Sequence, residues 1–179
     1  RLVKFFGSPG AVLNAPLKDL VRIRGVTPAV CQSIVDHRGN LPVDRELDMI
    51  NRHGCEVITI HDESYPANLR AIYDPPQVLY VKGNLLPSDS LAISIVGTRT
   101  ASSYGKMAAE QISSHLASRN VTIVSGLAYG IDTAAHRGAL NAGGRTIAVM
   151  GCGLDIVYPA GNSSLLEKII GSGAAISEF

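Results

Sequence analysis

The chain has 179 residues, of which 46% are hydrophobic and 17% charged, and its formal net charge is +1. This composition indicates a globular protein, because disordered chains carry fewer apolar residues and more charge of one sign. The apolar runs fall short of the ~20 residues that a bilayer-spanning helix needs, so we expect no membrane segment. The near-neutral charge excludes a broad basic surface, and any nucleic-acid site must rely on a few well-placed cations.

Residues 1–55 predict a small all-helical domain, in which short helices are interrupted by glycine and proline. Residues 19–35 predict two helices joined by a tight turn at Gly25, with Thr27 as N-cap and Pro28 as the first helical residue. This pair resembles a helix-hairpin-helix, whose turn amides can contact a DNA phosphate. Short glycine-turn pairs are often purely structural, and the structural interpretation is slightly favoured.

The three cysteines, Cys31, Cys55 and Cys152, form no Cys-x-x-Cys pair. An odd number without metal-ligand spacing favours free thiols over disulfides or a metal site. Free thiols are typical of a reducing compartment, so the expectation is a cytoplasmic protein with neither metal nor cofactor.

Residues 56–179 predict a second domain of α/β class. Strand-like runs at residues 56–60 and 78–81 flank a proline-rich connector, and repeated βα units begin at Ser90. The predicted fold is a parallel, Rossmann-like sheet that is incomplete at its C-terminal end, because such sheets usually have five or six strands.

Three strands of this sheet are predicted at residues 92–96, 121–124 and 146–150, and a fourth at 174–177. Helical patterns lie between them. In the first of these helices, Ala108, Ile112 and Leu116 recur every four residues, which predicts an apolar stripe packed on the sheet.

Each of the first three strands leads into a polar loop that contains glycine. Loops that follow parallel strands meet at one edge of the sheet, where glycine lets backbone amides approach a phosphate. Arg99 adds a planar guanidinium suited to phosphate oxygens. Arg145 precedes its strand, and a surface cation is as well supported there as a ligand contact. The candidate DNA-binding residues are Gly97, Thr98, Arg99, Ser125, Gly126, Arg145, Gly151 and Gly153.

Two enzyme signatures fail on inspection. Ser125, Asp132 and His136 could form a hydrolytic triad on paper, but Ser125 lacks the flanking glycines of a nucleophile elbow, and Asp132 is better explained as a helix cap. The pair Gly151 and Gly153 opens a dinucleotide fingerprint whose third glycine is absent. The sequence therefore predicts no catalytic residue.

Taken together, these segments resemble the DprA/Smf family of DNA-processing proteins of bacterial natural transformation. The match is dense over residues 57–179 and loose over 1–55, and it includes Ile-Val-Gly-Thr-Arg at 95–99 and Val-Ser-Gly-Leu-Ala-Tyr-Gly-Ile-Asp at 124–132. Further matching stretches are residues 104–105, 135–140, 143–149, 151–155, 158–159 and 176–178.

This resemblance implies an extended Rossmann-like domain preceded by a small domain of sterile-alpha-motif or helix-hairpin-helix type. It also implies protection of incoming single-stranded DNA, homodimerisation and loading of the RecA recombinase, without known catalysis. Tyr129 stands where relatives often carry a basic residue, and its ring could stack on a base instead.

A nucleotide enzyme is the alternative. Nucleoside-monophosphate phosphoribohydrolases of the lysine-decarboxylase-like family also bind phosphates on glycine loops, but they carry a Pro-Gly-Gly-x-Gly-Thr-x-x-Glu signature. No such string occurs in these 179 residues. Release of free base from AMP would distinguish this class from a DNA-binding protein.

Overall fold

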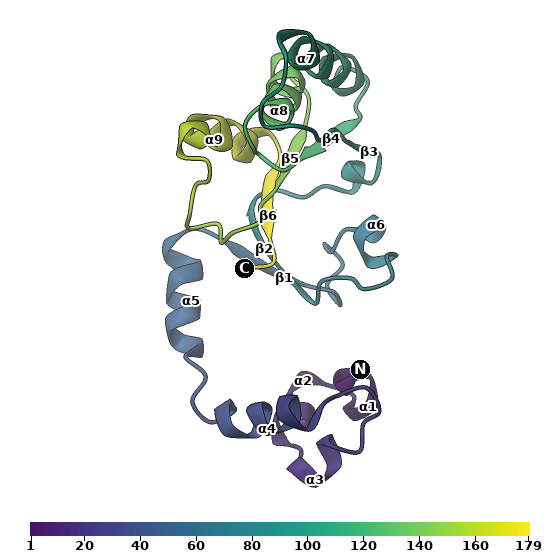
Figure 1. Ribbon diagram of the computed structural model, residues 1–179, viewed down its shortest axis with the longest axis vertical. Helices are drawn as coiled ribbons and strands as arrows, with labels where there is room; N and C mark the ends of the chain where they lie inside the picture. The colour runs from purple at the N-terminus through teal and green to yellow at the C-terminus, as the bar shows by residue number, and fades with distance from the viewer. The chain divides into compact units, whose positions relative to one another are not determined.

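The chain divides into two compact units, Arg1–Asp48 and Met49–Phe179. A computed structural model describes residues 1–179 (Figure 1). The division falls inside helix α5 (Val43–Arg52), a few residues before the boundary expected from the sequence.

The first unit contains short helices around a small apolar core. Its buried residues are Val12, Ala15, Leu20 and Cys31. The helices that precede α5 are α1 (Leu2–Phe6), α2 (Pro9–Asn14), α3 (Leu17–Leu20) and α4 (Pro28–His37).

Helix α4 begins where the sequence predicts it. The Thr27 hydroxyl accepts a hydrogen bond from the Val30 amide at 3.4 Å, and Pro28 is the first helical residue. Gly25 has a φ of 86°, which glycine adopts without a steric penalty. The helix before the turn is shorter than predicted: α3 ends at Leu20, whose carbonyl accepts from the Ile23 amide and closes a turn.

A six-stranded sheet forms the centre of the second unit, in the order β1-β2-β6-β5-β4-β3. Its strands are β1 (Glu56–Thr59), β2 (Val78–Gly83), β3 (Ala92–Ser94), β4 (Thr122–Ser125), β5 (Thr146–Val149) and β6 (Ala174–Ser177). The predicted strands all form, and the α/β class is correct. Strands β3 to β6 are mutually parallel.

The parallel arrangement predicted for the βα units is correct for β3 to β6, whereas β1 and β2, which precede those units, are antiparallel. Strand β2 runs antiparallel to β6, and β1 runs antiparallel to β2. The chain between β1 and β2 contains only the four-residue helix α6 (Ala67–Arg70). A helix of this length rises about 6 Å, less than the length of a strand, so it does not carry the chain back along the sheet as the crossover helix of a parallel pair does.

Strands β3, β4, β5 and β6 lie side by side in chain order. Their crossovers are helices α7 (Ser103–Ala117), α8 (Ile131–Asn141) and α9 (Ser163–Ser172). Because crossovers are right-handed, strands added in one direction place all their helices on the same face, as Figure 1 shows. The order of these four strands therefore does not reverse, and they contain no topological switch point, which is where open α/β sheets usually bind ligands. The candidate site is therefore identified from the loops that follow the strands.

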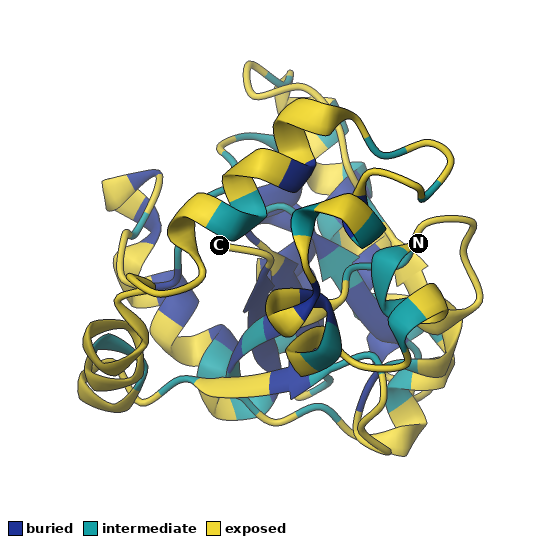
Figure 2. Ribbon diagram, turned by 90° about the horizontal axis from the view of Figure 1, so that it is seen from below, coloured by how far each residue is buried: buried dark blue, intermediate teal, exposed yellow.

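Both faces of the sheet are partly covered. Leu127, Ala148 and Ile169 belong to the core under the helices. On the opposite face, Tyr65 packs with Leu79 and other strand residues, and Figure 2 shows buried residues in the strands at the centre of the unit as well as in the helices.

Helix α7 is rotated relative to the predicted apolar stripe. Its buried residues are Ala109, Ser113 and Ala117, whereas Ile112 is 53% exposed. Helix α8 packs so closely on α7 that a side chain at Gly138 would collide with the Glu110 carbonyl. Small residues permit this approach, and the contact overrides the pattern of larger apolar side chains.

No helix combines the length and the apolar character needed to cross a membrane. The three cysteines are free thiols.

Candidate nucleic-acid interface

Three loops that follow β3, β4 and β5 form one continuous surface. We define the loop surface as residues 97–102, 126–132 and 150–162, and the last range includes the one-turn helix η2 (Ala160–Asn162). The second loop reaches the third, since the Asn162 side-chain amide donates to the Leu127 carbonyl at 2.8 Å. The ring of Tyr129 also lies against Gly161.

Asp132 connects the first loop to the second. It is 6% exposed, and its two carboxylate oxygens accept hydrogen bonds from the amides of Gly97 and Ala128, each at 3.3 Å. Its position in the first turn of α8 is also favourable for a negative charge. The amide of Gly97 is therefore already bonded to a carboxylate inside the protein.

Replacing Asp132 with alanine is expected to lower the free energy of unfolding by about 2 kcal/mol, since hydrogen bonds to a charged group contribute about 1.5–3 kcal/mol. Urea denaturation followed by circular dichroism measures the change. Replacing the exposed Asp155 with alanine is the control. Equal stability of both variants and the parent chain would show that Asp132 does not connect the loops.

Glycine is required where the first two loops touch. Gly130 has a φ of 83°, and a side chain there would collide with the carbonyls of Thr98 and Arg99. At Gly97, an added Cβ would lie 2.7 Å from the side chain of Ile131. The absence of side chains at these two glycines therefore lets the backbones of the first two loops approach each other.

Arg99 is the only basic residue of the loop surface. Its side chain is exposed and makes no hydrogen bond or ion pair. The loop that carries Arg99 is held in place, because the Thr98 hydroxyl accepts from the Thr100 amide at 3.2 Å and the Thr98 carbonyl accepts from the Ile131 amide. An unpaired guanidinium on an ordered loop can bind an anion in a bidentate manner.

The other predicted residues of the first two loops are more enclosed. Ser125 is 2% exposed, and its hydroxyl donates to the Ile95 carbonyl at 2.7 Å. An added Cβ at Gly126 would lie 2.8 Å from the Asp132 carboxylate. Ser125 thus joins β4 to the residue that follows β3, and its hydroxyl is turned inward.

Gly151 and Gly153 lie in the third loop. Gly151 is exposed, with open space where a side chain would be, whereas a side chain at Gly153 would meet Asp155. The Ser177 hydroxyl donates to the Cys152 carbonyl at 2.7 Å and fixes this loop to β6.

Arg145 is not brought together with these residues. It precedes β5 and so lies at the opposite edge of the sheet, where its Nε and Nη2 donate to the two oxygens of Asp89, both at 2.8 Å. Its guanidinium also donates to the carbonyls of Asn84 and Ser172.

Asp89 completes this ion pair. Burial raises the pKa of Asp89, but hydrogen bonds from Arg145, from the Leu86 amide and from the Thr122 hydroxyl outweigh that effect and hold the pKa below its usual value. Arg145 therefore binds a carboxylate within the protein.

His136 lies in the interior, where the backbone carbonyl of Ser125 is near the imidazole, whereas the Ser125 hydroxyl donates to the Ile95 carbonyl. The Nδ1 of His136 is 2.7 Å from the Thr146 hydroxyl, which itself donates to the Ile123 carbonyl. The other ring nitrogen, Nε2, is buried and makes no hydrogen bond. Ser125, Asp132 and His136 thus have separate partners and form no triad.

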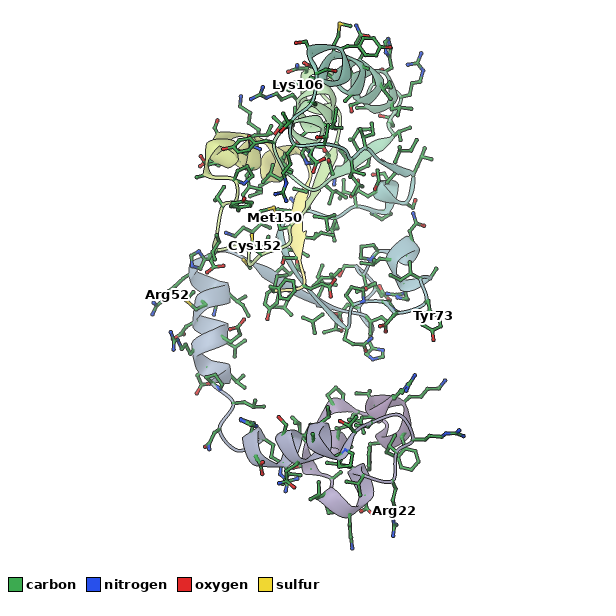
Figure 3. All side chains as sticks on the ribbon, in the orientation of Figure 1. Arg22, Arg52, Tyr73, Lys106, Met150 and Cys152 are labelled. Carbon is green, nitrogen blue, oxygen red and sulfur yellow. The ribbon has the colours of Figure 1, made fainter.

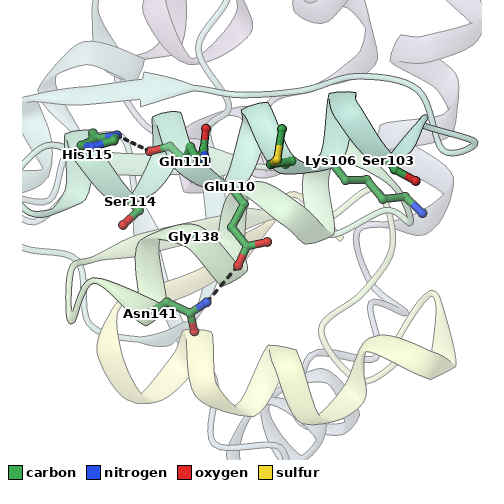
Figure 4. Close-up of a pocket in the computed structure, with 9 residues that line it drawn as sticks. Ser103, Lys106, Glu110, Gln111, Ser114, His115, Gly138 and Asn141 are labelled. Atoms are coloured by element: carbon green, nitrogen blue, oxygen red, sulfur yellow. Dashed lines mark hydrogen bonds between the residues drawn. The ribbon is translucent and has the colours of Figure 1, made fainter.

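A groove between α7 and α8 has no counterpart among the predictions. Figure 4 shows Glu110 of α7 accepting from the side-chain amide of Asn141 of α8, at 3.0 Å, across this groove. None of the predicted site residues lines it.

Comparison with known proteins identifies the family. The family model of DNA recombination-mediator protein A matches residues 56–179, a range that includes the whole sheet and the loop surface. The chain belongs to this family. The resemblance to DprA/Smf proteins inferred from the loop motifs is thereby confirmed.

Curated DprA and Smf proteins show the same relationship. The chain is 38% identical to protein Smf of Synechocystis over 164 residues, which are 89% of this chain and 41% of that protein. It is 45% identical to the DNA processing protein DprA of Streptococcus pneumoniae over 121 residues, 68% of this chain and 43% of that protein. The chain thus spans less than half the length of these two relatives.

Solved DprA structures share its fold. The Streptococcus pneumoniae DprA structure superposes with a TM-score of 0.76 at 36% identity, covering 93% of this chain and 57% of that one. A Helicobacter pylori DprA structure concerned with the single-stranded DNA binding mode of that protein gives a TM-score of 0.61 at 32% identity. That match covers 70% of this chain and 55% of the Helicobacter chain.

Exposed tyrosines on or beside the loop surface were not among the candidate residues, apart from the remark on Tyr129. Tyr104 and Tyr158 also follow strands β3 and β5, and both are exposed. Their positions after predicted strands are the signal that could have identified them.

Proposed function

We propose that the chain binds single-stranded DNA through the loop surface and acts as a recombination mediator rather than as an enzyme. The observation that carries this proposal is the unpaired guanidinium of Arg99 on a glycine-rich, ordered edge. Membership of the DNA recombination-mediator family and the single-stranded DNA binding of the Helicobacter relative support it.

The proposed contacts combine one charge with backbone groups. Arg99 pairs with a phosphate, and Gly97, Thr98, Gly126, Gly151 and Gly153 shape the loops around the strand. Ser125 and Arg145 support the sheet and make no contact with DNA, because their polar atoms already have partners inside the protein.

We extend the proposal to protection of incoming DNA, RecA loading, homodimer formation and a cytoplasmic location. The support is the family itself, whose members are recombination mediators. Acceleration of RecA filament formation on protein-coated single strands tests the loading step, and sedimentation equilibrium tests the dimer.

Replacing Arg99 with alanine is expected to weaken binding of a labelled oligo-dT about 10- to 150-fold, since a hydrogen-bonded contact to a charged group contributes about 1.5–3 kcal/mol. The loss should be similar for all sequences, and the dependence of log affinity on log salt should become shallower by about one unit. Fluorescence anisotropy at two salt concentrations measures both.

Arg119→Ala is the matched control. Arg119 is an exposed arginine after the C-terminal end of α7, at the other edge of the sheet, and the only hydrogen bond of its side chain is to the His115 carbonyl. Equal affinity of the Arg99 and Arg119 variants would remove Arg99 from the site. If AMP competes with oligo-dT and is cleaved to free base, the nucleotide-enzyme alternative replaces the proposal.

A further inference from the structure

Each of the three βα connections at the loop surface presents one exposed tyrosine. Tyr104 lies in the first turn of α7, Tyr129 in the loop before α8, and Tyr158 in the loop before η2. Their exposed fractions are 75%, 52% and 62%. We name these three residues the tyrosine row.

The hydroxyl groups of the tyrosine row make no hydrogen bond within the protein. Tyr65 shows the contrast, since it is 2% exposed and its hydroxyl donates to the Pro76 carbonyl at 2.8 Å. Tyr65 is therefore a core residue, whereas most of the aromatic surface of the tyrosine row faces solvent.

The connections that carry the row belong to adjacent strands. Strand β3 pairs with β4, and β4 pairs with β5, in parallel register. Neighbouring strands lie about 4.8 Å apart, so the three connections begin within about 10 Å of one another. The contact of Tyr129 with Gly161 joins the second loop directly to the chain just beyond Tyr158.

Charge alone does not explain DNA binding at this surface. The loop surface contains one basic residue, Arg99, and two acidic residues, Asp132 and Asp155, and the exposed Lys106 lies two residues beyond Tyr104, so the formal charge of the surface that carries the tyrosine row is 0. Asp132 is bonded to two amides, but Asp155 is exposed and repels phosphate. Affinity for a polyanion must therefore come largely from uncharged contacts, and aromatic rings supply these by stacking on bases.

We propose that the tyrosine row is a base-stacking platform, on which Tyr104, Tyr129 and Tyr158 each stack on one base of a single strand while Arg99 pairs with a phosphate. This inference rests on the proposed DNA binding and adds which part of the strand is recognised. Duplex DNA is excluded from this mode, because its bases are already stacked on each other.

The test compares two ligands with the same number of phosphates: a labelled oligo-dT and an abasic oligomer of equal length. Both are titrated against the 179-residue chain and against Tyr→Ala and Tyr→Phe variants at each position of the row. Tyr73→Ala is the matched control, since Tyr73 is fully exposed and lies beside α6, away from α7 in Figure 3.

Each alanine variant is expected to bind oligo-dT about 5- to 100-fold more weakly, and each phenylalanine variant to retain most of the affinity. The abasic oligomer should bind the parent chain at least about tenfold more weakly than oligo-dT and should not distinguish the variants. Tyr73→Ala should behave as the parent. Because the chain has no tryptophan, its emission comes from its six tyrosines, and quenching by oligo-dT that is reduced in the alanine variants of the row but not in Tyr73→Ala reports stacking on the row.

Two outcomes separate this inference from the function on which it rests. Equal binding of oligo-dT and the abasic oligomer by the parent chain would overturn base stacking and leave DNA binding intact. Binding of neither ligand would overturn the proposed function itself.

Discussion

Replacing Arg145 with methionine is expected to lower the free energy of unfolding by about 3–5 kcal/mol, the range found when one partner of a buried ion pair is removed. The Asp89 side chain is only 9% exposed and that of Arg145 25%, so the remaining carboxylate stays largely shielded from water. Arg145 also supplies the donors for the carbonyls of Asn84 and Ser172, which connect β2 and α9 to β5. Urea denaturation measures the loss.

A second substitution identifies its cause. Adding Asp89→Asn to Arg145→Met should recover part of the stability, because no unpaired charge then remains. Oligo-dT affinity of the folded Arg145→Met protein should equal that of the parent chain. Unchanged stability together with weaker DNA binding would instead make Arg145 a DNA ligand.

Acidification is expected to destabilise the fold through His136. Burial lowers the pKa of this imidazole from 6.5 to about 4, and the nearby Ser125 carbonyl opposes the shift without cancelling it. The unfolded chain takes up this proton near pH 6.5 and the folded chain only near pH 4. The free energy of unfolding should therefore fall by about 1.4 kcal/mol per pH unit between these values, about 3 kcal/mol in all.

Measurement of the free energy of unfolding from pH 7.5 to 3.5 tests this contribution. His136→Asn retains a donor for the Thr146 hydroxyl but does not titrate, so it should lose this pH-dependent component while being less stable at pH 7. His115→Gln, at an exposed histidine of α7, is the control and should keep it. Identical pH profiles for the parent chain and His136→Asn would contradict the assignment.

The fold was largely predictable because its signals are local. Apolar runs ending in glycine marked β3, β4 and β5, and Thr27 with Pro28 marked the start of α4. The direction of β2 has no local sequence signal, since it depends on how the chain returns to the sheet. The buried side of α7 depended on a contact with Gly138, a residue on another helix.

The candidate site was predictable only in outline. Placement after strands brought Arg99 to the edge where it was expected. The hydrogen-bond partner of Arg145 is Asp89, which is 56 residues away in the chain, and the Ser125 hydroxyl donates to a carbonyl 30 residues away. Spacing within a motif carries no information about such partners. For the same reason, the sequence suggested Asp132 as a helix cap but not as the connection between two loops.

The contacts of Asp132, Gly130 and Asn162 have a consequence for the affinity expected of the proposed complex with single-stranded DNA. They fix the three loops to one another before any strand arrives, so the protein loses little conformational entropy on association. Most of the conformational entropy lost on binding is then lost by the flexible nucleic acid. Affinity should accordingly rise when the strand itself is stiffened in an extended, unpaired form, whereas further rigidification of the protein should change it little.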